Sequence, residues 1–155
     1  MECNEFYMRM ALEEAAEAAR LGEIPVGAVA VDAEGRVLAR AHNLCETQRM
    51  PTHHAELLVV QEACRELGSW RLSNVTVYVT LEPCPMCMGA LIRARVARVV
   101  FGAPDPRAGA CGSLVDLTAY PLESSPEITG GVLGEESLEL LRSFFQSKRI
   151  PITLK

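Results

Sequence analysis

The chain has 155 residues, of which 49% are hydrophobic and 23% charged, and residues 1–155 are expected to form a single domain. No apolar run approaches the roughly 20 residues that a membrane-spanning helix needs. Acidic residues stand near the N-terminus, where a signal peptide would carry bases. The composition therefore predicts a soluble, cytoplasmic protein.

The net charge is −5, which argues against a surface built for nonspecific nucleic-acid binding. The bases are unevenly distributed, however. Residues 90–110 hold four arginines against Asp105 alone, and residues 140–155 hold four bases and no acid. Such clusters are usually the solvated faces of helices, but a localised contact with an anionic partner is also compatible with them.

Six cysteines are too few for a disulfide scaffold in a chain of this length. Cys84 and Cys87 are the only pair separated by two residues. A pair with this spacing in a reducing compartment is typical of metal binding or of thioredoxin-like redox chemistry, and the spacing alone leaves both open.

Hydrophobic periodicity predicts a helix, a hairpin and a second helix in the first half of the chain. Residues 5–21 follow helical spacing, residues 26–31 and 36–41 read as strands joined by a tight turn, and residues 53–67 read as a helix. The buried stripe of the second helix is expected to contain Leu57, Val60, Cys64 and Leu67.

The second half of the chain begins with alternating apolar residues at 75–80, a helix at 85–93 and a strand at 96–101. A strand, helix, strand connection predicts a parallel pair. A loop at 102–112, a short strand at 127–132 and a helix at 135–148 follow. The sequence therefore predicts an α/β fold with three α-β-α layers, in which a mixed five-stranded sheet carries an antiparallel N-terminal hairpin.

Cys84 and Cys87 fall at the predicted start of a helix, where unpaired N–H groups favour thiolates. His54 can supply a third ligand of the kind that zinc prefers. Three protein ligands leave one tetrahedral position open, which is typical of a catalytic rather than a structural zinc, and the bound water can then reach a pKa of about 7.

Glu56 lies two residues after His54, near enough to stand beside such a metal. A carboxylate there can take a proton from the zinc-bound water, deliver it to a ring nitrogen, and then protonate a leaving amine. His-x-Glu combined with Pro-Cys-x-x-Cys is the signature of zinc-dependent nucleobase deaminases. These residues therefore predict hydrolytic deamination.

The chain resembles the cytidine deaminase-like superfamily and, within it, the bacterial tRNA adenosine deaminase family. The resemblance rests on Pro25–Val29, His54–Glu56, Tyr78–Cys84, Arg98–Ala103 and a terminal helix with Phe144, Phe145, Lys148 and Arg149. It implies a cytidine deaminase-like fold, one zinc per subunit, a homodimer, and conversion of the wobble adenosine of a tRNA anticodon to inosine.

Together, the resemblance and the local clusters of bases indicate roles for nine residues. The metal ligands would be His54, Cys84 and Cys87, with Glu56 as the proton shuttle. Asn43 would hold the edge of the base, although without the resemblance a turn residue at the end of a strand is an equally good interpretation. The expected contacts to the anticodon loop are Asp105, Arg107, Lys148 and Arg149.

Two positions depart from the family pattern and keep other interpretations open. His53 stands beside His54 as a second imidazole, and Met88 gives a Cys-x-x-Cys-Met-Gly run similar to that of guanine deaminases. A deaminase of free guanine, cytosine or cytidine would use the same metal site without an RNA surface. A noncatalytic zinc or RNA-binding module would need a fourth protein ligand and no Glu56.

Overall fold

The sheet at the centre of the molecule has five strands in the order β2-β1-β3-β4-β5. The computed structural model describes the backbone of residues 2–153 and the side chains of residues 3–148. The strands are β1 (Gly27–Val31), β2 (Val37–His42), β3 (Thr76–Leu81), β4 (Arg98–Ala103) and β5 (Glu127–Thr129).

The strand directions confirm the predicted mixed sheet. β1 pairs antiparallel with β2 and with β3, whereas β3, β4 and β5 run parallel to one another. The hairpin turns at Asp32, whose Oδ1 accepts hydrogen bonds from the N–H groups of Glu34 and Arg36. This carboxylate replaces the ladder partners that the turn residues lack.

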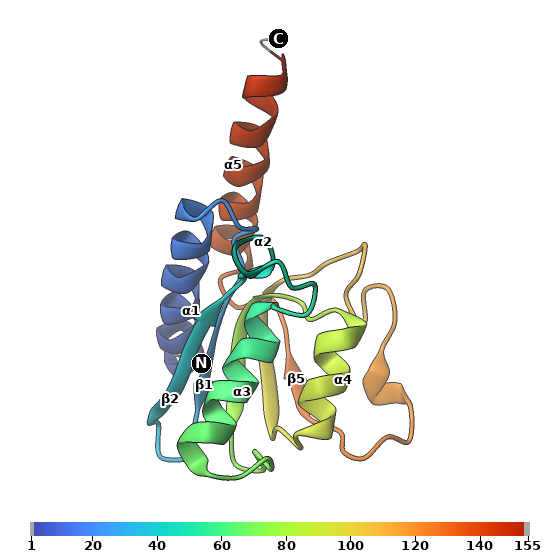
Figure 1. Ribbon diagram of the computed structural model, residues 1–155. Coiled ribbons are helices and arrows are strands. Elements are labelled where there is room, and N and C mark those ends of the chain that lie inside the picture. The colour runs from blue at the N-terminus through green and yellow to red at the C-terminus, as the bar shows by residue number, and fades with distance from the viewer. Residues whose placement is uncertain (1, 154–155) are drawn as a thin grey trace.

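The helices cover both faces of the sheet and confirm the three-layer architecture (Figure 1). α1 (Glu2–Arg20) and α5 (Gly134–Thr153) lie on one face, and α3 (Ala55–Leu67) and α4 (Pro85–Arg93) lie on the other. The far end of α5 extends past the body of the domain. Among the described residues, none of the helices is both long and apolar enough to span a membrane.

Two short elements were not expected from the sequence. α2 (Cys45–Gln48) interrupts the segment that precedes α3, and the 3₁₀ turn η1 (Leu117–Ala119) follows the loop after β4. Both are shorter than a stretch in which periodicity can be recognised.

The expected buried stripe of α3 was partly wrong. Ala55, Val59 and Ala63 are fully buried, whereas Leu67 is 39% exposed. Val60 and Cys64 pack only at the edge of the core. Small alanine side chains let the helix lie close to the sheet, so the face that packs is the one with the least bulk rather than the most hydrophobic area.

Close packing also explains a glycine in β1. A Cβ atom on Gly27 would lie 2.1 Å from the carbonyl oxygen of Ala11 and 2.5 Å from the backbone nitrogen of Ala15. Both atoms belong to the backbone of α1, which cannot move aside as a flexible side chain could. Gly27 therefore sets the distance between α1 and the sheet.

We expect Gly27→Ala to lower the free energy of unfolding by about 3 kcal/mol or more, because overpacking against backbone forces α1 off the sheet. Gly89→Ala is the matched control, since a Cβ there meets nothing within 4 Å. Urea unfolding of the two variants measures the difference, and equal midpoints would show that α1 is free to move.

Candidate metal centre and active site

The site forms where the first turns of two helices meet. His54 is the N-cap of α3 and Cys84 is the N-cap of α4, and both residues have extended backbone conformations. Pro85 then begins α4, where its missing N–H costs nothing. Because α3 and α4 contact each other on the same face of the sheet, their N-terminal ends and the side chains at those ends lie together.

Three donor atoms converge at this point. The Nδ1 atom of His54 lies 3.4 Å from Sγ of Cys87 and 3.6 Å from Sγ of Cys84. All three atoms lie within 4.8 Å of one another, and no other group of this kind occurs among the described residues. Two sulfurs and one imidazole nitrogen are a donor set that suits zinc and leaves a fourth tetrahedral position free of protein.

The two thiols differ in acidity. Hydrogen bonds from the Cys87 side chain and from His54 lower the pKa of Cys84 to about 4. The hydrogen bond to Cys84, together with burial, raises the pKa of Cys87, and the hydrogen bond to Cys84 also raises the pKa of His54. Without a metal, the group therefore holds one thiolate at Cys84 that is surrounded by donors. Zinc binds deprotonated cysteines and a neutral imidazole, so metal binding at this group would be accompanied by proton release.

Glu56 lies in the first turn of α3, close to the three donors. It is 4% exposed and close enough to His54, Cys84 and Cys87 for each of them to influence its pKa. Burial, which penalises the charged form, raises the pKa of Glu56 to about 7. A carboxyl group with such a pKa can both accept and release a proton near neutrality.

Asn43 joins β2 to the start of α3. Its side-chain Oδ1 accepts a hydrogen bond of 2.8 Å from the N–H of Ala55, the first residue of the helix. The side chain of His54, the N-cap residue, makes no capping bond. Asn43 instead satisfies one of the N–H groups that the start of a helix leaves unpaired. The sequence did not predict this role, since a cap twelve residues away has no local pattern.

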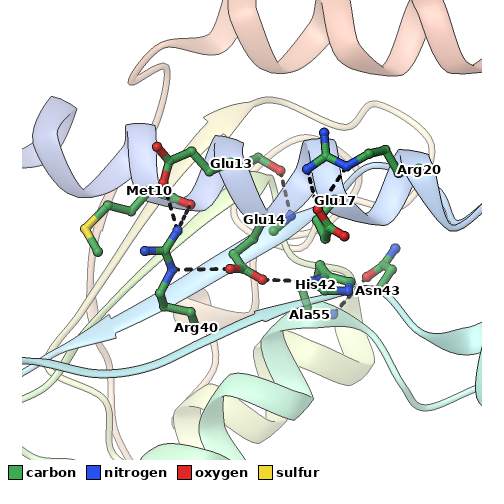
Figure 2. A network of polar contacts seen from close by, with 11 residues as sticks. Met10, Glu13, Glu14, Glu17, Arg20, Arg40, His42, Asn43 and Ala55 are labelled. Carbon is green, nitrogen blue, oxygen red and sulfur yellow. Dashed lines mark hydrogen bonds and ion pairs between the residues drawn. The ribbon is translucent and has the colours of Figure 1, made fainter.

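The end of β2 is in turn fixed to α1 by a network of charged groups (Figure 2). One carboxylate oxygen of Glu14 lies 2.8 Å from Nδ1 of His42, and the other lies 3.2 Å from Nε of Arg40. Arg40 also bonds to Glu13. The network therefore holds the strand that delivers Asn43 to the site.

The expected RNA contacts lie apart from the metal group. Asp105 and Arg107 border a groove of about 660 Å³ between their loop and α5, and Arg142 and Phe145 border it from α5. This volume is typical of small-molecule sites, roughly 300–1,000 Å³. Lys148 packs over the ring of Phe144, and the side chain of Arg149 lies outside the described residues.

Two buried carboxylates shape the loops on either side of the site. Glu23, 1% exposed, accepts hydrogen bonds from the N–H groups of Glu46 and Thr47 at α2. Glu82, 2% exposed, binds the loop after β4. Burial alone would raise the pKa of Glu82, but the Ser113 hydroxyl and three backbone N–H groups lower it overall. The sequence signal for both is an acidic residue beside a buried apolar run, a pattern that does not reveal which loop the carboxylate binds.

The two departures from the family pattern point away from the metal. His53 lies 2.5 Å from the side-chain oxygen of Gln48 through its Nδ1 atom and is not part of the donor group. Met88 is fully buried in the core, where its sulfur receives a weak contact of 3.6 Å from Cys111. Met88 therefore fills the interior rather than lining a substrate site.

Comparison with known proteins shows the family of this chain. A family model described as MafB19-like deaminase matches residues 3–137, which defines the chain as a deaminase. A tRNA-specific adenosine deaminase of Bacillus subtilis is 49% identical over 96% of this chain and 92% of that protein. A solved structure of a tRNA:A34 deaminase has a TM-score of 0.85 and 42% identity, and the match covers 88% of this chain and 99% of that one.

A guanine deaminase of Bacillus subtilis is also similar, with a TM-score of 0.61 and 37% identity over 64% of each chain. Its match is shorter than those of the tRNA-specific relatives, which extend over nearly the whole chain. The chain belongs to the tRNA-specific adenosine deaminase family.

We expect His54→Ala and Cys87→Ala to lose bound zinc, because two donors cannot complete a stable tetrahedral site. His53→Ala is the matched control, since this imidazole faces Gln48. Zinc per chain, measured by atomic emission after dialysis, should stay near one in the control. Retention of zinc by the His54 variant would show that another imidazole holds the metal.

Proposed function

We propose that this protein converts the wobble adenosine of a tRNA anticodon to inosine, with His54, Cys84 and Cys87 as zinc ligands and Glu56 as the proton shuttle. The observation that carries the proposal is the buried carboxyl of Glu56 beside a three-donor group. A structural zinc site needs four protein ligands and no neighbouring acid, so this arrangement is suited to catalysis.

Bound zinc would supply a water of lowered pKa as the nucleophile for the base. Glu56 would accept a proton from that water and pass it to a ring nitrogen. It would then carry the second proton to the departing amine, so that adenosine and water give inosine and ammonia. Burial disfavours the charged form of Glu56, which suits a carboxyl that acts first as a base and then as an acid.

Asn43 lies beside the reacting position because its oxygen binds the N–H of Ala55, between His54 and Glu56. With this oxygen engaged, the amide NH₂ remains as the group that can donate a hydrogen bond to a base edge. We therefore assign Asn43 both tasks, capping α3 and orienting the base.

The groove along α5 supports an RNA rather than a free base as substrate. Most arginines elsewhere form ion pairs, as Arg20, Arg36, Arg40, Arg65, Arg93 and Arg98 do. Among the side chains of residues 3–148, no ion pair involves Arg107, Arg142 or Lys148. Cations without partners beside an apolar groove fit phosphates and unstacked bases of a loop.

A cytoplasmic homodimer completes the proposal. It is supported by the family resemblance and by exposed large apolar side chains near the site, among them Met50, Met86 and Leu114. The zinc measurement above, combined with the mass in solution, tests the ratio of one zinc per subunit.

The zinc-loaded protein should form inosine when it is incubated with an anticodon stem-loop that carries adenosine at the wobble position. Free guanine and cytidine, followed as xanthine and uridine, serve as competing substrates. Glu56→Ala should keep its zinc and lose turnover by about 10²–10⁴-fold, because only the proton carrier is removed. Xanthine formation without inosine would favour a guanine deaminase instead.

We expect Lys148→Glu combined with Arg149→Glu to weaken binding of the stem-loop without changing the zinc content. The slope of log binding constant against log salt should fall by about one for each phosphate contact that is lost. Arg36→Glu carries a charge reversal at the hairpin, far from α5, and is the control. Unchanged binding at low salt would remove the end of α5 from the RNA surface.

A further inference from the structure

Glu82 is the residue after β3 and lies two residues before Cys84. Its carboxylate is fully engaged by the loop that follows β4. One oxygen, Oε1, accepts hydrogen bonds from the N–H of Asp105 at 3.0 Å and from the Ser113 hydroxyl. The other, Oε2, accepts from the N–H groups of Cys111 at 2.9 Å and Ser113 at 3.1 Å.

These bonds matter because the loop of residues 104–113 lies outside the strand ladder. The loop is only partly buried, but its N–H groups that face the interior must still be satisfied, and the Glu82 carboxylate accepts hydrogen bonds from three of them. Beside them, the N–H of Ala110 donates to the carbonyl oxygen of Pro83 at 2.8 Å. The loop is therefore bound to the two residues that lead directly into the metal-binding turn.

The loop sequence is adapted to this carboxylate. A Cβ atom on Gly109 would lie 2.3 Å from the carboxyl carbon of Glu82 and 2.4–2.5 Å from its two oxygens. Only glycine allows the loop backbone to come this close. The N–H of Asp105 donates a hydrogen bond to Glu82, and Oδ1 of Asp105 accepts hydrogen bonds from the N–H groups of Arg107 and Ala108. Glu82 therefore also restrains the backbone of Arg107 at the groove.

We propose that Glu82 is a positioning residue for RNA binding: it fixes the loop that carries Asp105 and Arg107 against the turn that carries Cys84, so that the groove and the reacting base keep a constant separation. The inference rests on the proposed function, because it assumes that the groove binds RNA. It assigns Glu82 no contact with the substrate or the metal.

Glu82→Gln tests the proposal with almost no change in shape. In either orientation, the glutamine NH₂ group replaces an oxygen that accepts two hydrogen bonds. Placed at Oε2, it would face the N–H groups of Cys111 and Ser113, and placed at Oε1 it would face that of Asp105. The loop would therefore lose its fixed position while Cys84 and Cys87 remain in place.

Asp32→Asn is the matched control, because Asp32 also accepts two backbone N–H groups of a turn, at the hairpin. We expect the Glu82 variant to raise KM for the anticodon stem-loop by about tenfold while kcat at saturating RNA changes by less than about threefold. Zinc should stay near one per chain. Hydrogen exchange at residues 105–113 should accelerate in this variant and not in the control.

Gly109→Ala provides an independent variant, because it disturbs the same contact while it leaves Glu82 intact. The same rise in KM with retained zinc would support the proposal. Loss of zinc together with kcat, or faster loop exchange with unchanged KM, would overturn it. If the wild-type protein leaves the stem-loop unmodified, the proposed function fails. If the wild-type protein is active and both variants keep its KM and kcat, only the positioning role of Glu82 is overturned.

Discussion

The convergence of the N-terminal ends of α3 and α4 is the constraint on which the rest of the site depends. His54 and Cys84 each stand one residue before a helix, so neither side chain is restricted by a helical turn and both can face the gap between the helices. Hydrogen bonds from the Cys87 side chain and from His54 favour the thiolate at Cys84, and the positive ends of the two helix dipoles meet at the same place. This positive field disfavours a dication. The negative charge of two thiolate ligands offsets that repulsion and makes metal binding possible. The same packing buries Glu56, and this burial raises the pKa of its carboxyl group.

The loops around this centre make no hydrogen bonds of a β-ladder. Carboxylates of acidic side chains accept hydrogen bonds from the backbone N–H groups of these loops instead. Glu23 orders the segment at α2, Glu82 orders the loop after β4, and Asp32 orders the hairpin turn through bonds to backbone N–H groups. A carboxylate suits this task because it has several acceptor sites and no donor, so it can satisfy N–H groups that point at one spot. Each such residue costs desolvation, which its bonds must offset. The loops near the site are therefore fixed by single residues.

Much of the fold was predictable because its signals are local. The alternating residues of β3 and the apolar run of β1 predicted these two strands, and the turn at Asp32 predicted the antiparallel pairing of β1 with β2. The spacing of Cys84 and Cys87, read with His54 and Glu56, predicted a group that the structure brings together. Contacts between distant segments were not predictable from a single sequence. The bond from Asn43 to α3, the burial of Ala63 in place of Leu67 and the hold of Glu82 on its loop all depend on how the layers pack.

The acidic net charge of −5 and an RNA substrate are compatible because screening makes charge a local property. At physiological salt the Debye length is about 8 Å, so exposed acids beyond that distance contribute little to the potential at the groove. The acid of the groove, Asp105, uses one oxygen for N–H groups of its own loop. Arg107 and Arg142 at the groove and Lys148 farther along α5 are free of ion pairs within residues 3–148. Under the proposed function, an anionic loop that reaches this edge would therefore meet arginines without competing ion pairs, while the acidic remainder of the protein would disfavour nonspecific binding elsewhere.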